Sequence, residues 1–225
     1  MLAEYRTVAR EAEITLIEKK SKFIARIKPV QSKEEAEAFI EEVRKVHWNA
    51  THNVPAYIIG INQEIQKYSD DNEPGGTAGL PVLEVLKAHN VVNAVIVVTR
   101  YFGGILLGRG GLVRAYGGAA REALKAAGIV RMVPSIQVGI TVDYVHAGRI
   151  QNELLTQGVF LEDTEYMEKV TFRLLLLPQE REPLRQTIQE LTANDFLWRK
   201  GRKCTGPCPW KQRAESLHSR SQLGE

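Results

Sequence analysis

Arginines and glycines gather between residues 100 and 114, directly after a run of β-branched residues at 94–99. The set consists of Arg100, Gly103, Gly104, Gly108, Arg109, Gly110, Gly111 and Arg114. Glycine permits positive φ and a close approach of the backbone, free N–H groups at a helix start attract anions, and guanidinium groups match phosphate. We therefore expect this segment to bind an anion or a phosphate. A tight strand-to-helix turn without a ligand is the alternative.

Two nucleotide-binding motifs do not fit this segment. No Gly-Lys-Ser/Thr ends it, so it is not a Walker A loop. The spacing of Gly108, Gly110 and Gly111 comes close to a dinucleotide-binding fingerprint but is not in its register.

A polar loop at 69–77 contains clustered acids, Asp70, Asp71 and Glu73. Clustered carboxylates suit hard cations, but the spacing of an EF-hand is missing, and Asp and Asn also favour turns. The alternative is a turn whose acids cap the following helix or pair with an arginine such as Arg100. We expect no metal site here.

Two histidines, His47 and His52, could serve acid–base or metal chemistry. No cysteine lies nearby and no nucleophile elbow is present, so a catalytic site cannot be assembled. The alternative for His52 is a hydrogen bond across the same cleft. Cys204 and Cys208 have no matching second pair for zinc. We expect no catalytic residue, no metal and no cofactor.

Aromatic residues lie close to the arginines in the predicted layout, namely Tyr57, Tyr68, Tyr101, Phe102 and Tyr116. Aromatic rings beside arginine can stack on bases or form a protein hot spot. Phe102 and Tyr57 could instead belong to the core. We expect either Tyr101 or Tyr116 to be exposed, but not both.

The first 133 residues predict strands and helices that bring these segments together. Alternation predicts strands at 12–18 and 22–28, and Ser32 is a candidate N-cap of a helix over 33–47. Further expected elements are a strand at 56–61, a helix at 78–89, a strand at 94–99 covered on both faces, and a helix at 112–127 ended by Gly128. We expect a layer of strands with helices on one face.

A second unit is predicted from Pro134 to residue 200. Its elements follow the order β-α-β-β-α-β, which is typical of a ferredoxin-like sandwich. Residues 201–225 show no period, and we expect a disordered or atypical tail, with a frameshifted end as one hypothesis.

The composition is ordinary for a soluble globular protein, and 225 residues allow one large or two small domains. With the predicted elements, we expect an α+β chain of two domains. The net charge is +3, but residues 201–225 hold five basic and two acidic residues, so residues 1–200 are neutral. This composition does not by itself indicate strong nucleic-acid binding, which uses a pronounced basic face. The start shows no signal peptide, no apolar run approaches the ~20 residues of a membrane span, and both cysteines lie near the end. We expect a cytoplasmic protein.

Residues 77–86 (TAGLPVLEVL) and 97–116 (VVTRYFGGILLGRGGLVRAY) carry a specific resemblance. They resemble the signature of the YigZ/IMPACT family, in which a strand ends in Arg-Tyr-Phe-Gly-Gly and a glycine-rich loop leads into a helix. Residues 47–53 and 70–77 also match this pattern. The resemblance covers residues ~10–130 densely, and 134–200 only through the ferredoxin-like domain of bacterial members.

The resemblance implies a ribosomal-protein-like βαβ N-terminal domain, also seen in elongation factor G, followed by a ferredoxin-like domain. It implies a non-catalytic regulator linked to translation, because eukaryotic members are linked to the kinase that phosphorylates an initiation factor. Those members carry a different extra domain. The implied partner is the ribosome, RNA or a regulatory protein. Candidate partner-binding residues are His52, Asp70, Asp71, Glu73, Thr77, Tyr101 and Tyr116. A small phosphate-ligand enzyme and a purely protein-binding regulator are the alternatives.

Overall fold

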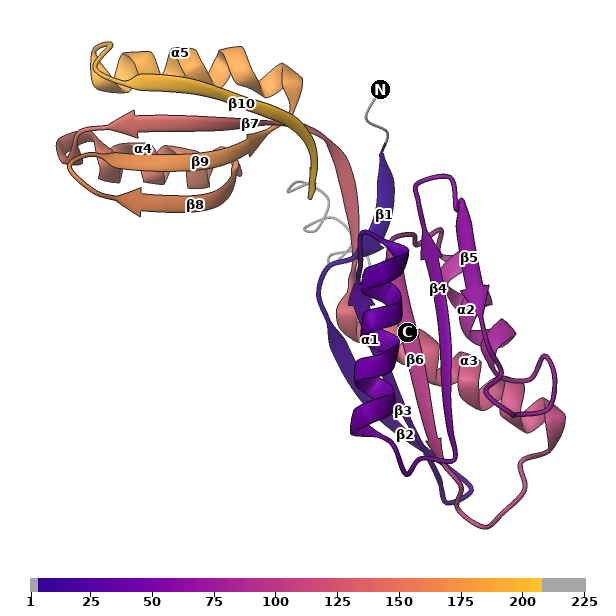
Figure 1. Cartoon of the computed structure of the whole chain (residues 1–225). Coiled ribbons are helices and arrows are strands. Elements are labelled where there is room, and N and C mark those ends of the chain that lie inside the picture. Colours follow the sequence, from indigo (N-terminus) through magenta and orange to yellow (C-terminus); the bar gives the residue numbers. More distant parts are fainter. Residues whose placement is uncertain (1–3, 208–225) are drawn as a thin grey trace, which may run out of the picture. The chain divides into compact units, whose positions relative to one another are not determined.

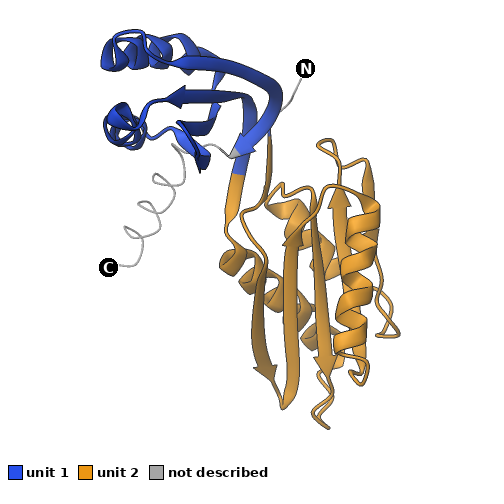
Figure 2. Cartoon of the chain, turned by 60° about the vertical axis from the view of Figure 1, so that its left-hand side comes forward, with its two compact units in different colours: residues 1–4, 131–225 blue, residues 5–130 orange. Residues whose placement is uncertain are grey.

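The computed structural model describes residues 4–207, which form two compact units (Figure 2). One unit spans Tyr5–Val130 and the other begins at Arg131. Strand β7 (Ile129–Val142) continues from the first unit into the second. Pro134, where the sequence predicted the second unit to begin, therefore lies inside a strand. There it lies opposite Thr205 of strand β10 (Leu197–Pro207), and pairing with strand β9 (Val170–Leu176) begins at Ile136.

The N-terminal unit is built on an antiparallel sheet with the strand order β2-β3-β6-β4-β5. These strands are β2 (Ala12–Glu18), β3 (Ser21–Pro29), β6 (Ala94–Tyr101), β4 (His52–Ile59) and β5 (Ile65–Tyr68). Both β3 and β4 pair antiparallel with β6, so they run parallel to each other on its two sides. Helix α1 (Lys33–Val46) joins them, which gives the predicted βαβ arrangement.

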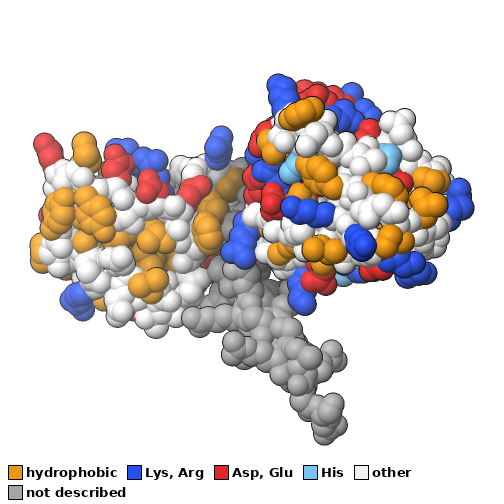
Figure 3. All heavy atoms as spheres, turned by 90° about the horizontal axis from the view of Figure 1, so that it is seen from below, with side chains coloured by type: hydrophobic (Ala, Val, Ile, Leu, Met, Phe, Trp, Pro, Cys, Tyr) orange, Lys and Arg blue, Asp and Glu red, His pale blue; other side chains and the backbone are white. Residues whose placement is uncertain are grey.

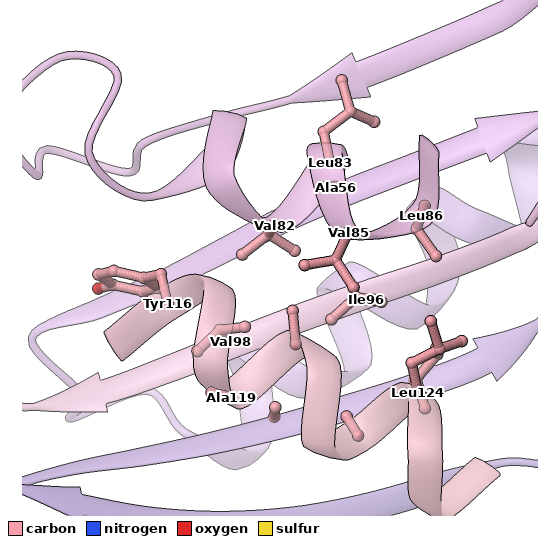
Figure 4. Packing of buried hydrophobic residues seen from close by; sticks show 14 of the residues in the cluster. Ala56, Val82, Leu83, Val85, Leu86, Ile96, Val98, Tyr116, Ala119 and Leu124 are labelled. Carbon is pink, nitrogen blue, oxygen red and sulfur yellow. The ribbon is translucent and has the colours of Figure 1, made fainter. Parts of the chain in front are cut away.

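Helices cover both faces of this sheet, so the prediction of helices on one face was wrong (Figure 1). Helix α1 packs Phe39 and Val43 against Tyr57 and Val97 on one face. On the other face, α2 (Gly79–Ala88) and α3 (Gly108–Ala127) pack against the sheet (Figure 4). Every residue of Ala94–Arg100 is buried, and this confirms that the β-branched run is covered on both sides.

Local signals placed several helix ends correctly. The Ser32 hydroxyl accepts a hydrogen bond from the Glu35 N–H at 3.2 Å, as expected of an N-cap. Gly128 ends α3 with a positive φ of 72°. Helix α3 begins at Gly108 rather than at residue 112, so three of the clustered glycines belong to its first turn. Strands β1 (Tyr5–Val8) and β5 were not predicted.

The second unit has the predicted ferredoxin-like topology. Its elements are β7, α4 (Tyr144–Thr156), β8 (Phe160–Tyr166), β9 (Val170–Leu176), a 3₁₀ turn (Pro178–Glu180), α5 (Arg181–Thr192) and β10 (Leu197–Pro207). The strands pair antiparallel in the order β10-β7-β9-β8. Buried aliphatic side chains of the sheet pack against Ile150, Leu154 and Ile188 of the two helices.

The expected tail does not begin at residue 201, because β10 continues to Pro207. A register shift between Lys200 and Lys203 lets this segment keep pairing with the long strand β7. The lack of sequence period therefore did not prevent strand formation where a pairing edge was present. Cys208 and the rest of the predicted tail lie outside the described residues. No helix within residues 4–207 is long and apolar enough to cross a membrane.

Candidate functional site

Three central strands place a row of side chains at one end of the N-terminal sheet. In register, Phe23 of β3 lies opposite Arg100 of β6, and His52 of β4 lies opposite Arg100 from the other side. These residues adjoin the loop after β6 and the start of α3. The resemblance and the glycine cluster both pointed to this end of the sheet.

Arg100 is a buried structural cation. Its Nη1 donates to Glu73 Oε1 at 2.6 Å, and its Nη2 lies 3.4 Å from the Ser21 hydroxyl. Its Cζ lies 5.5 Å from the ring centroids of both Phe23 and Phe102. Arg100 therefore stabilises this end of the sheet. Its guanidinium is occupied by contacts within the protein and is not available to bind an anion.

Glu73 accepts hydrogen bonds from two side chains and lies close to a third. Besides Arg100, the Tyr116 hydroxyl donates to Oε1 at 2.7 Å, and His52 Nε2 lies 3.6 Å away. Burial and the hydrogen bond to Glu73 raise the pKa of Tyr116. Tyr116 is fully buried, which corrects its prediction as a partner-facing side chain. The aromatic ring packs edge-on against Phe23, with centroids 5.2 Å apart.

The aspartates of the polar loop accept hydrogen bonds from backbone N–H groups of the protein itself. Asp70 accepts hydrogen bonds from the N–H groups of Gly76, Ala78 and Gly79 at 2.8–3.0 Å, so it caps α2. Asp71 Oδ2 accepts from the Asn53 N–H at 2.6 Å. These contacts match the alternative in which the acids cap the helix and pair with Arg100. Thr77 is buried and its hydroxyl donates to Pro74 O at 2.6 Å.

In the glycine-rich segment 103–111, one glycine packs tightly against a neighbouring backbone, and the first turn of α3 has no side-chain cap. A Cβ on Gly103 would lie 2.0 Å from the backbone carbon of Lys20, so only glycine fits there. Gly104 and Gly108 adopt positive φ, and a Cβ on either would meet nothing. No side chain caps the first turn of α3, which contains no acid. Arg109 Nη2 donates to Gly75 O at 2.9 Å at the surface.

Exposed cations and apolar side chains gather around this end. We define the loop face as Lys19, Lys20, Lys22, Trp48, Phe102, Ile105, Leu106, Arg109 and Arg114. Trp48 and Leu106 are each 81 % exposed, and Phe102 is 46 % exposed. The right half of Figure 3 shows the N-terminal unit from this end. Hydrophobic side chains are interleaved there with Lys and Arg.

Two hollows adjoin the start of α3, and Leu107 lines both. One, of about 450 Å³, is bounded by His52, Phe102 and Arg109. The other, of about 330 Å³, is bounded by Lys19 and Arg114. Leu107 therefore lies between a hollow lined by Gly108 and Arg109 and a hollow lined by Gly111 and Arg114.

Tyr101 is half-buried at the rim of this region. Its hydroxyl lies 3.0 Å from His47 Nδ1 and donates to Asn49 Oδ1 at 3.3 Å. Burial lowers the pKa of His47. Sequence reasoning missed Trp48 and the three lysines of the β2–β3 hairpin. A tryptophan directly after a helix, at a turn, was the signal that could have found Trp48.

Within residues 4–207, no cluster of three or more His, Cys, Asp or Glu side chains could hold a metal ion. The predicted site residues thus divide into an internal group and an exposed group. Arg100, Glu73, Asp70, Thr77 and Tyr116 stabilise the end of the sheet. Arg109 and Arg114 remain at the surface.

Comparison with known proteins matches the two halves of the chain separately. The Impact N-terminal domain matches residues 19–124, and a domain of unknown function (DUF1949) matches residues 140–194. The chain is 43% identical over 192 residues to the IMPACT family member YvyE of Bacillus subtilis, covering 85% of this chain and 88% of that protein.

Other relatives cover one or both units. The IMPACT family member YigZ of Escherichia coli is 42% identical over 169 residues, which is 73% of this chain and 83% of that protein. Protein IMPACT of Oryctolagus cuniculus is 33% identical over 98 residues, which is 42% of this chain and 31% of that protein. A solved structure described as a hypothetical protein aligns with a TM-score of 0.57 at 29% identity, over 90% of this chain and 99% of that one.

Proposed function

This chain belongs to the IMPACT family, and from that premise we propose that it is a non-catalytic binding protein that contacts RNA of the translation apparatus through the loop face. The link to translation rests on the family resemblance and its ribosomal-protein-like fold. The choice of RNA rests on the side chains of the loop face.

The observation that carries the proposal is a group of exposed cations that have no acidic partner within residues 4–207. Lys19, Lys20, Lys22, Arg109 and Arg114 form no ion pair with any other residue of the described range 4–207. Phosphate contacts supply most of the affinity of nonspecific nucleic-acid binding. The chain's modest net charge is therefore less informative than where these cations lie.

The turn between β2 and β3 supports the same assignment. Lys19 and Lys20 are its only two residues, and both have positive φ, 45° and 67°. Asn-Gly fills such a turn without strain, whereas other residues cost about 1 kcal/mol or more each in this conformation. Because two lysines occupy this turn despite their conformational strain, we infer that their charges contribute to RNA binding.

Exposed aromatic rings complete a surface suited to unpaired RNA. Trp48 and Phe102 lie at the same end of the sheet as the cations. Base–aromatic stacking contributes ~1–3 kcal/mol per base and tolerates any sequence. Unpaired RNA loops are recognised in this way, by stacking together with backbone charge. Arg100 is not part of the proposed contact, because it pairs with Glu73.

Binding of the purified full chain to ribosomes and to total RNA, at low and raised salt, tests the proposal. Wild type should bind, and binding should weaken steeply with salt. Arg109→Gln/Arg114→Gln should bind more weakly at every salt concentration. Arg173→Gln, on the second unit, is the matched control and should bind like wild type. Salt-independent binding, or none, would sink the RNA assignment.

A purely protein-binding role is the second candidate, because Ile105 and Leu106 expose aliphatic surface on the same face. Contiguous exposed apolar side chains mark protein contacts. Under that role, Leu106→Ser should weaken binding to ribosomes or to a protein partner, and the remaining binding should keep nearly the same salt dependence. The phosphate-ligand enzyme has less support, since its central cation is neutralised by Glu73.

A further inference from the structure

The larger hollow beside α3 has an apolar wall and a polar corner. Phe102, Leu107, Leu112 and Pro74 provide apolar surface, and His52 lies at the polar corner, where Thr51, Glu73 and Arg100 also line the hollow. Its volume of about 450 Å³ falls within the ~300–1,000 Å³ typical of small-ligand pockets. A ligand here would be mostly apolar with a polar group directed at His52.

The hydrogen bonds of His52 define what that polar group must be. Its Nδ1 lies 2.7 Å from Asp71 O, and a carbonyl oxygen only accepts, so Nδ1 carries a proton. In the neutral imidazole, Nε2 is then an acceptor. Glu73 Oε1, which lies 3.6 Å from Nε2, is also an acceptor and already receives hydrogen bonds from Arg100 and Tyr116.

Within the part of the chain that the structure describes, Nε2 of His52 has no hydrogen-bond donor. A donor from outside can fill this position. The ligand that fits the corner therefore brings an N–H or O–H group, while its remaining surface contacts the apolar wall.

Phe102 provides a flat support for a planar ligand. The guanidinium of Arg100 lies 5.5 Å from its ring centroid, while nearly half of the residue stays exposed, at 46 %. Arg109 lies at the rim of the same hollow, where it can meet a charged group outside. A planar ring, an N–H donor and an attached anion are the three chemical features that these residues match.

We propose that this hollow takes one unstacked nucleobase of the bound RNA, with its ring on Phe102 and an N–H of its Watson–Crick edge donating to His52 Nε2. Each of the four bases carries an N–H donor on that edge, so the hollow accepts any of them. This inference rests on the proposed function, because the cations of the loop face hold the backbone that delivers the base. The same cations favour RNA over an apolar peptide side chain as the occupant.

The test compares hexaribonucleotides of A, C, G or U with an abasic ribose-phosphate hexamer of equal charge. Affinities for the full chain are measured by fluorescence anisotropy at low salt. Wild type should bind the base-containing hexamers at least about 5-fold more tightly, since stacking contributes ~1–3 kcal/mol per base. His52→Asn can keep the N–H that meets Asp71 O while removing the Nε2 acceptor.

His52→Asn and Phe102→Leu should each reduce the preference for bases by about 3- to 10-fold. Arg114→Gln, outside this hollow, should weaken binding of both ligands equally and leave the preference unchanged. Should His52→Asn fail to fold by circular dichroism, Phe102→Leu alone decides.

Failure of the inference and failure of the proposed function give different results. Salt-sensitive binding without a preference for bases, or with a preference that neither variant changes, would overturn the inference and leave RNA binding in place. Absence of binding to every hexamer and to ribosomes would overturn both, and would leave the hollow open to a peptide side chain.

Discussion

Arg100 Nη1 lies 2.6 Å from Glu73 Oε1, and the two side chains are only 6 % and 3 % exposed. This buried ion pair joins the polar loop before α2 to the end of the central strand. It therefore fixes the position of both segments that flank the larger hollow. The most conspicuous arginine of the glycine-rich segment is a structural residue, and the surface cations beside it are the candidates for binding.

Removing one partner of this pair should strongly destabilise the protein. Glu73→Gln leaves the Arg100 charge buried without compensation and also weakens the acceptor for Tyr116. We expect a loss of about 3–5 kcal/mol in the free energy of unfolding, measured by urea denaturation.

Glu84→Gln is the matched control, because Glu84 pairs with Lys87 at the surface at 3.0 Å. Exposed pairs contribute ~0–1 kcal/mol. A loss for Glu73→Gln no larger than that of this control would show that the buried pair does not stabilise the end of the sheet.

Asp70 should give the stability a dependence on pH. Burial raises the pKa of its carboxyl, but hydrogen bonds from three backbone N–H groups outweigh burial, and the pKa is lowered overall. A depressed pKa stabilises the folded state above the unfolded-state value of about 3.9, and this contribution disappears as the pH falls through the folded-state pKa.

Asp70→Asn should therefore cost about 1–2 kcal/mol at pH 7, through weaker capping of α2, and progressively less below about pH 4. Urea denaturation of both proteins from pH 3 to pH 7 measures the difference. A difference that stays constant across this range would mean that the charge of Asp70 is unimportant for the cap.

Two glycines near the loop face should respond to alanine with opposite signs. A Cβ on Gly103 would collide with the Lys20 backbone, so Gly103→Ala should destabilise by about 1–3 kcal/mol. A Cβ on Gly118, inside α3, would meet nothing within 4 Å, so Gly118→Ala should stabilise by up to about 1 kcal/mol. Thermal unfolding of the two variants measures both signs, and a loss at Gly118 would contradict the packing described for α3.

The lysine turn should trade stability against binding. Lys19→Asn/Lys20→Gly relieves the strain of two lysines at positive φ and should raise the free energy of unfolding by about 1–2 kcal/mol. The same change removes two cations of the loop face and should weaken RNA binding. Anisotropy and urea denaturation on the same samples test the pair of effects. A more stable variant with unchanged affinity would show that Lys19 and Lys20 do not contribute to RNA binding.

Local signals predicted much of the fold from the sequence. The Ser32 cap, the β-branched run of β6 and the stop at Gly128 each depend on residues within one element, and each was placed correctly. Strand β5 was missed because its four residues are all exposed and carry no alternation of buried positions. Its existence depends on pairing with β4.

The candidate site was harder to predict because burial is decided by distant partners. Tyr116 is buried among the hydrophobic core, and its hydroxyl donates to Glu73, 43 residues away in the chain. The fate of Arg100 likewise depends on a partner 27 residues away, which the sequence could offer only as an alternative. The lysines of the hairpin turn lie beside the glycine segment because β3 pairs with β6 and Gly103 packs against Lys20.

The most direct test of the central claim is the salt dependence of RNA binding by the full chain and by Arg109→Gln/Arg114→Gln. Each phosphate contact to single-stranded RNA contributes about −0.7 to the slope of log affinity against log salt. We predict that the double variant binds more weakly and that its slope is smaller in magnitude by up to about 1.4. Identical affinities and slopes for the two proteins would contradict the assignment of the loop face as the RNA-binding surface.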